Sequence, residues 1–213
     1  MAKTAAHKPK QTPKPPGKIF ILSPASLNGE RAKHLLSPTG RSETARQLRS
    51  PEGAPLEEVF TFVSSLYFRG KMAYVERFAA PPDGFPKEGG ALVIAQGFGL
   101  VPTSWRIDRE RAEVLRRTSI DLKCPEYVGP MREHLEALRD NLPPETQVVL
   151  LGSIATGKYV DLLEPVFGDW LLFPREFVGA GDMRRGSLML RAAREGQELD
   201  YVTLSNPRHS RRP

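Results

Sequence analysis

The sequence predicts an α/β fold, a single domain with a central sheet that is mostly parallel or mixed and is flanked by helices. Four short apolar runs are the basis of this prediction, and the segments between them are long enough to hold helices. Each run is continuously apolar over four or five residues, which is typical of a strand buried on both faces of a parallel sheet. The four runs are residues 19–22, 91–95, 148–151 and 170–173.

Helical patterns fill the segments between these runs. Pro55 suits the first position of a helix, and apolar residues then recur at three- and four-residue spacing up to Tyr67. Gly70 interrupts this pattern, which residues 72–78 resume. Further helices are expected at 28–36, 42–48, 108–117, 130–142, 157–163 and 183–194, and a short edge strand at 201–204.

The positive charge of the chain belongs to its two ends. The formal net charge is +6, but residues 1–18 hold five lysines and four prolines, residues 206–213 hold three arginines, and neither segment contains an acid. Subtracting these eight charges leaves about −2 for residues 19–207. We therefore predict a disordered, Lys/Pro-rich basic tail at 1–18, a single α/β domain at 19–205 and a basic C-terminal tail at 206–213.

Composition excludes several classes of protein. No apolar segment is long enough to cross a bilayer or to form a signal peptide, so we expect a cytoplasmic protein without a membrane partner. The single cysteine, Cys124, excludes an internal disulfide, and the four histidines lack metal-ligand spacing, so we expect no metal and no cofactor. The basic tails are typical of segments that attract nucleic acid, and a solubilising extension is the alternative.

Ligands of open α/β sheets bind at the carboxyl ends of the strands, so the residues after the four runs are candidate site residues. Backbone amides and small side chains would line this crevice, basic side chains would supply charge, and tyrosines could stack on a base. The small residues are Ser23, Gly97, Gly99, Gly152 and Ser153; the basic residues are Arg69, Lys158, Arg175 and Arg185; the tyrosines are Tyr67 and Tyr159. Arg69 interrupts the long helical pattern, either as a basic turn aimed at the crevice or as a solvated break between two helices.

Two of these segments have patterns of their own. Residues 152–158 match the spacing G-x-x-x-x-G-K of a phosphate loop, but Tyr159 stands where Ser or Thr would ligate magnesium. The pattern therefore favours either an anion site at a helix N-terminus or a simple tight turn. Arg185 is expected in the first turn of a helix capped by Asp182. Its charge opposes the helix dipole there, which suggests a carboxylate or phosphate partner, with an ion pair to Glu176 as the alternative.

Five short segments, taken in order, resemble the YaaA-type peroxide-stress protein family. They are residues 22–25, 66–70, 96–102, 155–159 and 185–186. The resemblance implies an α/β fold with a cleft, a DNA-binding role and a link to oxidative damage, without a defined catalytic mechanism.

We therefore expect a nucleic-acid-binding protein linked to DNA stress or base metabolism, with a crevice for a phosphate or a base. One alternative is an enzyme that acts on a nucleotide, a nucleoside or another phosphorylated small molecule in the same crevice. Another is a non-catalytic interaction module whose crevice is unused. No motif in the chain identifies catalytic residues or decides whether the protein is an enzyme.

Overall fold

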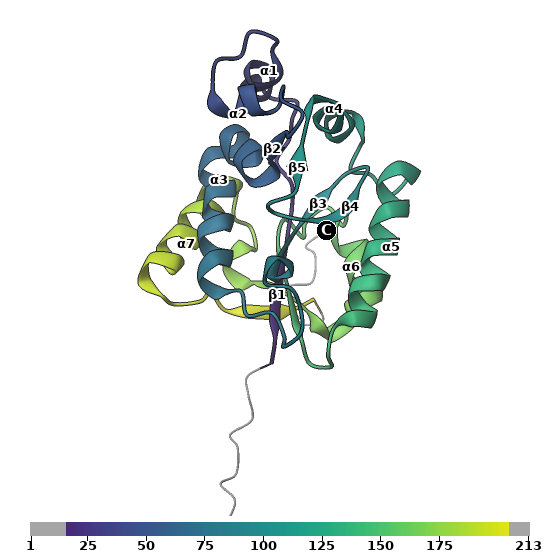
Figure 1. Ribbon diagram of the computed structural model, residues 1–213. Coiled ribbons are helices and arrows are strands. Elements are labelled where there is room, and N and C mark those ends of the chain that lie inside the picture. The colour runs from purple at the N-terminus through teal and green to yellow at the C-terminus, as the bar shows by residue number, and fades with distance from the viewer. Residues whose placement is uncertain (1–15, 205–213) are drawn as a thin grey trace, which may run out of the picture.

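Six strands form one mixed sheet at the centre of the molecule (Figure 1). The computed structural model describes residues 16–204; the predicted tails lie almost wholly outside them, although Lys18 already belongs to the first strand. The strand order is β4-β3-β1-β6-β7-β8. The strands are β1 (Lys18–Leu22), β3 (Ala91–Ala95), β4 (Gly99–Pro102), β6 (Gln147–Leu151), β7 (Leu171–Pro174) and β8 (Tyr201–Thr203).

The four predicted apolar runs are adjacent parallel strands. β1 pairs with β3 on one side and β6 on the other, and β6 pairs with β7. The predicted edge strand is confirmed as β8, antiparallel to β7. β4, antiparallel to β3 at the other edge, was not predicted. Gly97 in the turn after β3 and Gly99 at the start of β4 both have positive φ, and both were expected to line the crevice.

Helices cover both faces of the sheet, with α3 and α7 on one face and α5 and α6 on the other (Figure 1). They are α1 (Glu30–Leu36), α2 (Glu43–Gln47), α3 (Leu56–Phe78), α4 (Arg109–Arg117), α5 (Pro125–Asn141), α6 (Val160–Phe167) and α7 (Asp182–Glu195). Short pieces complete the fold: β2 (Ala54–Pro55), β5 (Arg106–Ile107), η1 (Lys87–Gly90), η2 (Gly168–Trp170) and η3 (Arg175–Phe177). None of the helices described is both long and apolar enough to cross a membrane.

The two-sided cover explains the continuous apolarity of the strands. Phe20 and Leu22 pack into the core beneath α3 and α7. Ile19 and Ile21 pack into the core beneath α5 and α6. Because successive side chains of a strand point to opposite faces, a strand covered on both faces has no solvent-facing position left for a polar residue.

Helices α3 and α7 cross with their backbones in contact, which corrects the prediction that Gly70 interrupts the helical pattern. A Cβ atom on Gly70 would lie 2.7 Å from the carbonyl oxygen of Gly186, and one on Gly186 would lie 2.8 Å from the carbonyl oxygen of Leu66. Gly70 therefore lies inside α3 as a packing residue, and the irregular backbone is five residues earlier, at Ser65 (φ 25°). The crossing brings the next residue of α3, Lys71, close to the charges of α7.

Three other predicted helix starts shift. α5 begins at Pro125 rather than Pro130, because Pro125 occupies its first turn and Pro130 is accommodated inside the helix. α6 begins at Val160 rather than 157, so the residues of the phosphate-loop pattern form an irregular turn before it. Gly181, rather than Asp182, is the N-cap of α7, and Asp182 is the first helical residue.

Candidate functional site

The order of the parallel strands places a switch in direction at the carboxyl ends of β1 and β6. From β1 the chain moves to β3 on one side and later returns to β6 on the other. In doubly wound sheets such a switch point opens a crevice in which ligands bind. Ser23 follows β1, and Gly152 and Ser153 follow β6, so these residues meet at the switch point.

A crevice of about 540 Å³ lies at this point. Its walls come from the residues after β1, β3 and β6, from α3 and α7, and from the end of α4 and the loop that follows it. The lining residues are Ser23, Pro24, Ala25, Ser26, Leu27, Asn28, Tyr67, Gln96, Arg116, Arg117, Thr118, Ser119, Ile120, Ser153, Lys158, Tyr159, Asp182 and Arg185.

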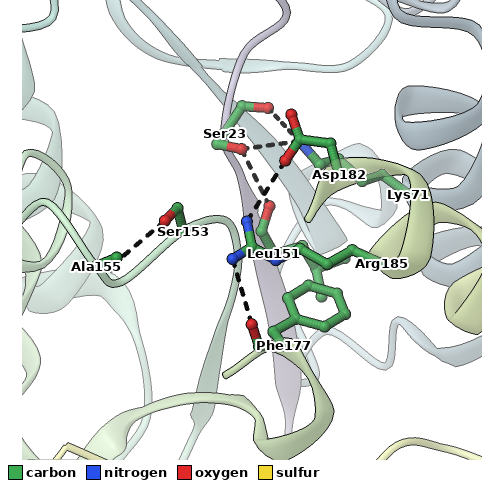
Figure 2. A network of polar contacts seen from close by, with 8 residues as sticks. All are labelled: Ser23, Lys71, Leu151, Ser153, Ala155, Phe177, Asp182 and Arg185. Carbon is green, nitrogen blue, oxygen red and sulfur yellow. Dashed lines mark hydrogen bonds and ion pairs between the residues drawn. The ribbon is translucent and has the colours of Figure 1, made fainter. Parts of the chain in front are cut away.

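A fully buried lysine lies behind Ser23 (Figure 2). Lys71 Nζ is 2.8 Å from Ser23 Oγ and 2.6 Å from the Ser23 carbonyl oxygen. Among the described residues these two atoms are its only hydrogen-bond acceptors, and no carboxylate lies within ion-pair distance. Burial lowers the pKa of Lys71 to about 7; the charge of Asp182 opposes this fall and that of Arg185 adds to it.

The hydrogen bonds around Ser23 can be arranged in two ways. If Lys71 is charged, Nζ donates to both Ser23 atoms, and the Ser23 hydroxyl can donate to the carbonyl oxygen of Leu151, 3.3 Å away. If Lys71 is neutral, its lone pair can accept the hydroxyl proton of Ser23. The Ser23 hydroxyl can therefore either accept a hydrogen bond from the Lys71 ammonium or donate one to the neutral Lys71 amine.

Three buried side chains of the crevice each have a polar atom without a hydrogen-bond partner among the described residues. They are Tyr67 Oη, Gln96 Oε1 and Arg185 Nε, on residues that are 7%, 5% and 7% exposed. Two of these side chains are held in place by their other polar atoms. Gln96 Nε2 donates to the Leu115 carbonyl at 2.8 Å. Arg185 donates to the Phe177 carbonyl at 3.2 Å, as Figure 2 shows. Leaving buried polar groups unpaired costs about 1–3 kcal/mol each, so this arrangement suits a ligand that would pair them.

Positive charge dominates the crevice. Arg116, Arg117, Lys158 and Arg185 line it, against a single lining carboxylate, Asp182. Arg185 Nη1 is 3.5 Å from Asp182 Oδ1. The carboxylate partner suggested for Arg185 is therefore Asp182 and not Glu176. Arg116 and Arg117 both lie close to Glu113, outside the lining, so their charges are partly balanced. Burial raises the pKa of Tyr67, and the charge of Arg185 opposes that rise, as do weaker polar interactions of the hydroxyl with the Arg185 and Ser23 side chains. Neither side chain meets the distance and angle of a hydrogen bond to Tyr67 Oη.

The structure brings together most of the predicted site residues. Six of them line the crevice: Ser23, Tyr67, Ser153, Lys158, Tyr159 and Arg185. Gly152 borders it, since a Cβ atom there would lie 3.1 Å from Ser23 Cβ. Stacking on a base is disfavoured for both tyrosines, because each ring is more than nine-tenths buried and lies near a lysine Nζ, that of Lys71 for Tyr67 and that of Lys158 for Tyr159.

Four predicted site residues do not line the crevice. Arg69 is exposed on the outer side of α3, and Arg175 is exposed at the start of η3, where the chain turns away after β7. Gly97 and Gly99 form the tight turn between β3 and β4, with Gly97 packed near Val114 and Gly99 against His134. Arg175 and the two glycines do follow strands, but following a strand does not determine which way a residue points, and Arg69 lies inside α3.

Sequence reasoning missed Lys71, Gln96, Asp182, Arg116 and Arg117 as site residues. Gln96 directly follows β3, so the strand-end rule applied to it, but the two glycines after it received the assignment. Lys71 stood in a segment read as a helix break. Arg116 and Arg117 end α4, and only the packing of that helix across the strand ends brings them to the crevice.

A larger hollow of about 1210 Å³ runs along the outer side of α3 and includes Arg69, Phe62 and Met72. None of the buried polar atoms that lack a partner in the described chain belongs to a residue lining it. Among the described residues, the lining of this hollow therefore offers no unpaired buried polar atom that a ligand could pair. Within residues 16–204 no group of three or more metal-ligating side chains is present either. The crevice at the switch point is therefore the better candidate site.

Comparisons with protein-family models, with curated proteins and with solved structures find no match to this chain.

Proposed function

We propose that the protein binds a phosphorylated small molecule of nucleotide size in the crevice at the ends of β1 and β6. The three unpartnered buried atoms are the observation that carries the proposal. Arg185 Nε and Tyr67 Oη can donate to anionic or carbonyl oxygens, and Gln96 Oε1 can accept from a hydroxyl or amino group. A nucleotide offers both kinds of partner, and its phosphates suit the excess of positive charge.

Free nucleotides and a nucleotide unit of a nucleic-acid strand share this chemistry, and the crevice favours the free molecule. Its volume of about 540 Å³ is in the range of sites for single small ligands. Outside the two basic ends the chain carries about −2 charges, which gives little attraction for a long polyanion. The link to DNA stress and the resemblance to YaaA-type proteins remain predictions.

Calorimetric titration of the full chain tests the proposal, with inorganic phosphate, the nucleoside mono-, di- and triphosphates and a short single-stranded DNA as separate probes. Binding of a nucleotide should weaken about 10-fold or more in Arg185→Gln, because a hydrogen bond from a charged donor is worth about 1.5–3 kcal/mol. Arg175→Gln is the matched control, since Arg175 is basic, exposed and outside the crevice. Equal affinities of the two variants, or no nucleotide binding at all, would contradict the proposal.

The DNA arm separates the two sources of phosphate. If DNA binds and nucleotides do not, and the affinity falls in Arg185→Gln but not in Arg175→Gln, the crevice holds a strand rather than a free nucleotide. If DNA binds equally to both variants with a steep salt dependence, the basic ends or another surface carry that binding.

A further inference from the structure

We propose that Ser23 is a nucleophile and Lys71 its general base, and that the crevice hydrolyses carboxylic esters or thioesters whose leaving group carries phosphate. This inference gives a reaction to the site proposed above, and so its substrate class rests on the proposed function. The Ser23–Lys71 pair itself rests only on the geometry around Ser23.

Position is the first argument. Ser23 lines the crevice and is 5% exposed, whereas Lys71 is fully buried and does not line it. A ligand in the crevice therefore meets the hydroxyl group first, with the amine 2.8 Å behind it. Hydrogen-bond contact between a nucleophile and a base is the geometry that activates a serine.

The surroundings of Lys71 are the second argument. The charged groups that act on it are Asp182 and Arg185, both from α7; α3 contributes the rings of Tyr67 and Phe68, and the segment after β1 contributes only Ser23. Burial without an ion-pair partner favours the neutral amine, whose pKa falls to about 7. An amine that titrates near neutrality is suited to accept a proton, and a buried ammonium with no such role would only cost stability.

Unpartnered donors beside Ser23 are the third argument. Attack on an ester creates negative charge on the carbonyl oxygen, and donors fixed in advance stabilise that charge. Arg185 Nε and Tyr67 Oη are buried donors without partners, and both residues line the same crevice as Ser23. The contact of Gly70 with Gly186 fixes the helices that carry them.

The reaction balances with water as the only co-reactant. Ser23 Oγ bonds to the carbonyl carbon while its proton passes to Lys71 Nζ; the carbon–oxygen or carbon–sulfur bond to the leaving group then breaks, and Lys71 returns the proton to the leaving atom. Water attacks the acyl-serine, giving a proton to Lys71, which passes it to Ser23 Oγ as that bond breaks. The products are a carboxylic acid and an alcohol or thiol, and the residues regain their starting protonation.

Labelling of the full chain with an alkyl fluorophosphonate tests the pair, because this reagent phosphonylates activated serines and releases fluoride. Peptide mass spectrometry should find the label on Ser23, and the labelling rate should rise with pH around 7. Ser23→Ala should lose the label, and Lys71→Met should slow labelling about 100-fold or more, the size of a general-base effect. Tyr74→Phe, a buried change one turn further along α3 and outside the crevice, controls for loss of stability, and Ser50→Ala controls for the loss of a serine.

Label on another serine, an equal rate in Lys71→Met, or a wild-type rate that does not change between pH 5 and 9 would overturn the inference. The pH profile decides the matter even if Lys71→Met does not fold. Adding a nucleotide during labelling separates the two proposals: Lys71-dependent labelling without protection supports the pair and contradicts the nucleotide site, while nucleotide binding without labelling contradicts the pair and supports the site. Hydrolysis of the thioester acetyl-coenzyme A, whose leaving group carries phosphate, should depend on Ser23 and Lys71 in the same way as the labelling does. If unlabelled wild-type protein reacts with the fluorophosphonate on Ser23 but does not hydrolyse the thioester, the substrate class is overturned.

Discussion

Two polar clusters lie at the two ends of β1, one partly exposed and one buried, and they differ in how completely their atoms are paired. The Tyr74 cluster consists of Lys18, Tyr74, Glu198 and Tyr201 and includes the first residue of the strand. The Lys71 cluster consists of Ser23, Tyr67, Lys71 and Arg185 and includes the residue after its last. Helix α3 contributes to both clusters, with Lys71 and Tyr74 only three residues apart.

The Tyr74 cluster is complete. Tyr74 Oη is 2.7 Å from Tyr201 Oη and accepts from the Leu199 backbone at 2.9 Å; Tyr201 also contacts Glu198, which pairs with Lys18. The Lys71 cluster holds a lysine without a carboxylate partner and two polar atoms without any partner in the described chain. A completed network stabilises a fold, whereas an incomplete one costs stability and is expected where a ligand or a reaction completes it. The difference supports the proposal that a ligand binds at the carboxyl end of β1, which is its upper end in Figure 1.

The largest effect at a fixed pH should come from separating α3 from α7, because the Lys71 cluster spans these two helices. In Gly70→Ala the new methyl group would lie 2.7 Å from a backbone oxygen of Gly186, which cannot move without shifting α7. We expect a loss of about 3 kcal/mol in the free energy of unfolding, the upper part of the usual range for overpacking. Urea denaturation measures it.

Gly129→Ala is the control for this substitution, since a Cβ atom on Gly129 meets nothing within 4 Å and the residue lies inside α5. That change should stabilise the protein by about 0.5–1 kcal/mol. Equal stabilities of the two variants would show that the helices do not need their close contact.

The next effect is a pH dependence between about pH 7 and 10, which comes from Lys71; the raised pKa values of Tyr74 and Tyr201 act only above that window. Folding lowers the pKa of Lys71 from its usual value near 10.5 to about 7, so between these values the unfolded chain binds more protons than the folded one. Stability contributed by this group therefore rises with pH from about 7 to 10, by up to about 1.4 kcal/mol per pH unit. Lys71→Met lacks this group, so its free energy of unfolding should not show this rise. The difference between the two proteins should therefore shift in favour of wild type as the pH rises from about 7 to 10, in denaturation measured at several pH values. A difference between the two proteins that is constant with pH would mean that Lys71 keeps an ordinary pKa.

A smaller effect compares the two buried tyrosines of α3. Tyr74→Phe leaves the Tyr201 hydroxyl and the Leu199 backbone N–H without this partner and should cost about 1–3 kcal/mol. Tyr67→Phe removes a hydroxyl that has no partner among the described residues, so its stability should stay within about 0.5 kcal/mol of wild type or rise. Thermal unfolding of both variants checks the contrast, and equal losses would remove the distinction between the clusters.

The sequence predicted some parts of the fold and of the crevice and not others. The four parallel strands were predictable because burial on both faces leaves a local trace, a continuous apolar run such as residues 148–151. The place of Ser23 in the lining of the crevice was predictable because it follows such a run. β4 was not, since four residues after a tight glycine turn carry too little pattern.

Lys71 was beyond local patterns because its burial depends on a contact between distant segments. In the sequence it follows Arg69 and Gly70 and is typical of a solvated turn. Its burial requires the close packing of α7 on α3, which depends on Gly186, more than one hundred residues later, because a side chain there would clash with the backbone of α3. Arg175 shows the reverse error: it follows a strand directly, but the η3 turn leaves it exposed. Side-chain direction after a strand depends on the turn that follows, and one strand pattern does not specify that turn.

The smallest change concerns the space that Gly152 leaves for Ser23. A methyl group at Gly152 would lie 3.1 Å from Ser23 Cβ, 3.4 Å from Ser23 Oγ and 3.2 Å from Leu150 Cδ1, so the serine and the leucine side chain would have to move by a few tenths of an ångström. We expect Gly152→Ala to cost about 1 kcal/mol or less, because the crevice beside Ser23 offers room for the shift. Its fluorophosphonate labelling should nevertheless fall several-fold with an unchanged pH midpoint, because the substitution moves the nucleophile and leaves the burial of Lys71 intact. A shifted midpoint would mean that the substitution acts on Lys71 instead, and unchanged labelling would show that the reactivity of Ser23 tolerates displacement and does not depend on the 2.8 Å contact with the amine.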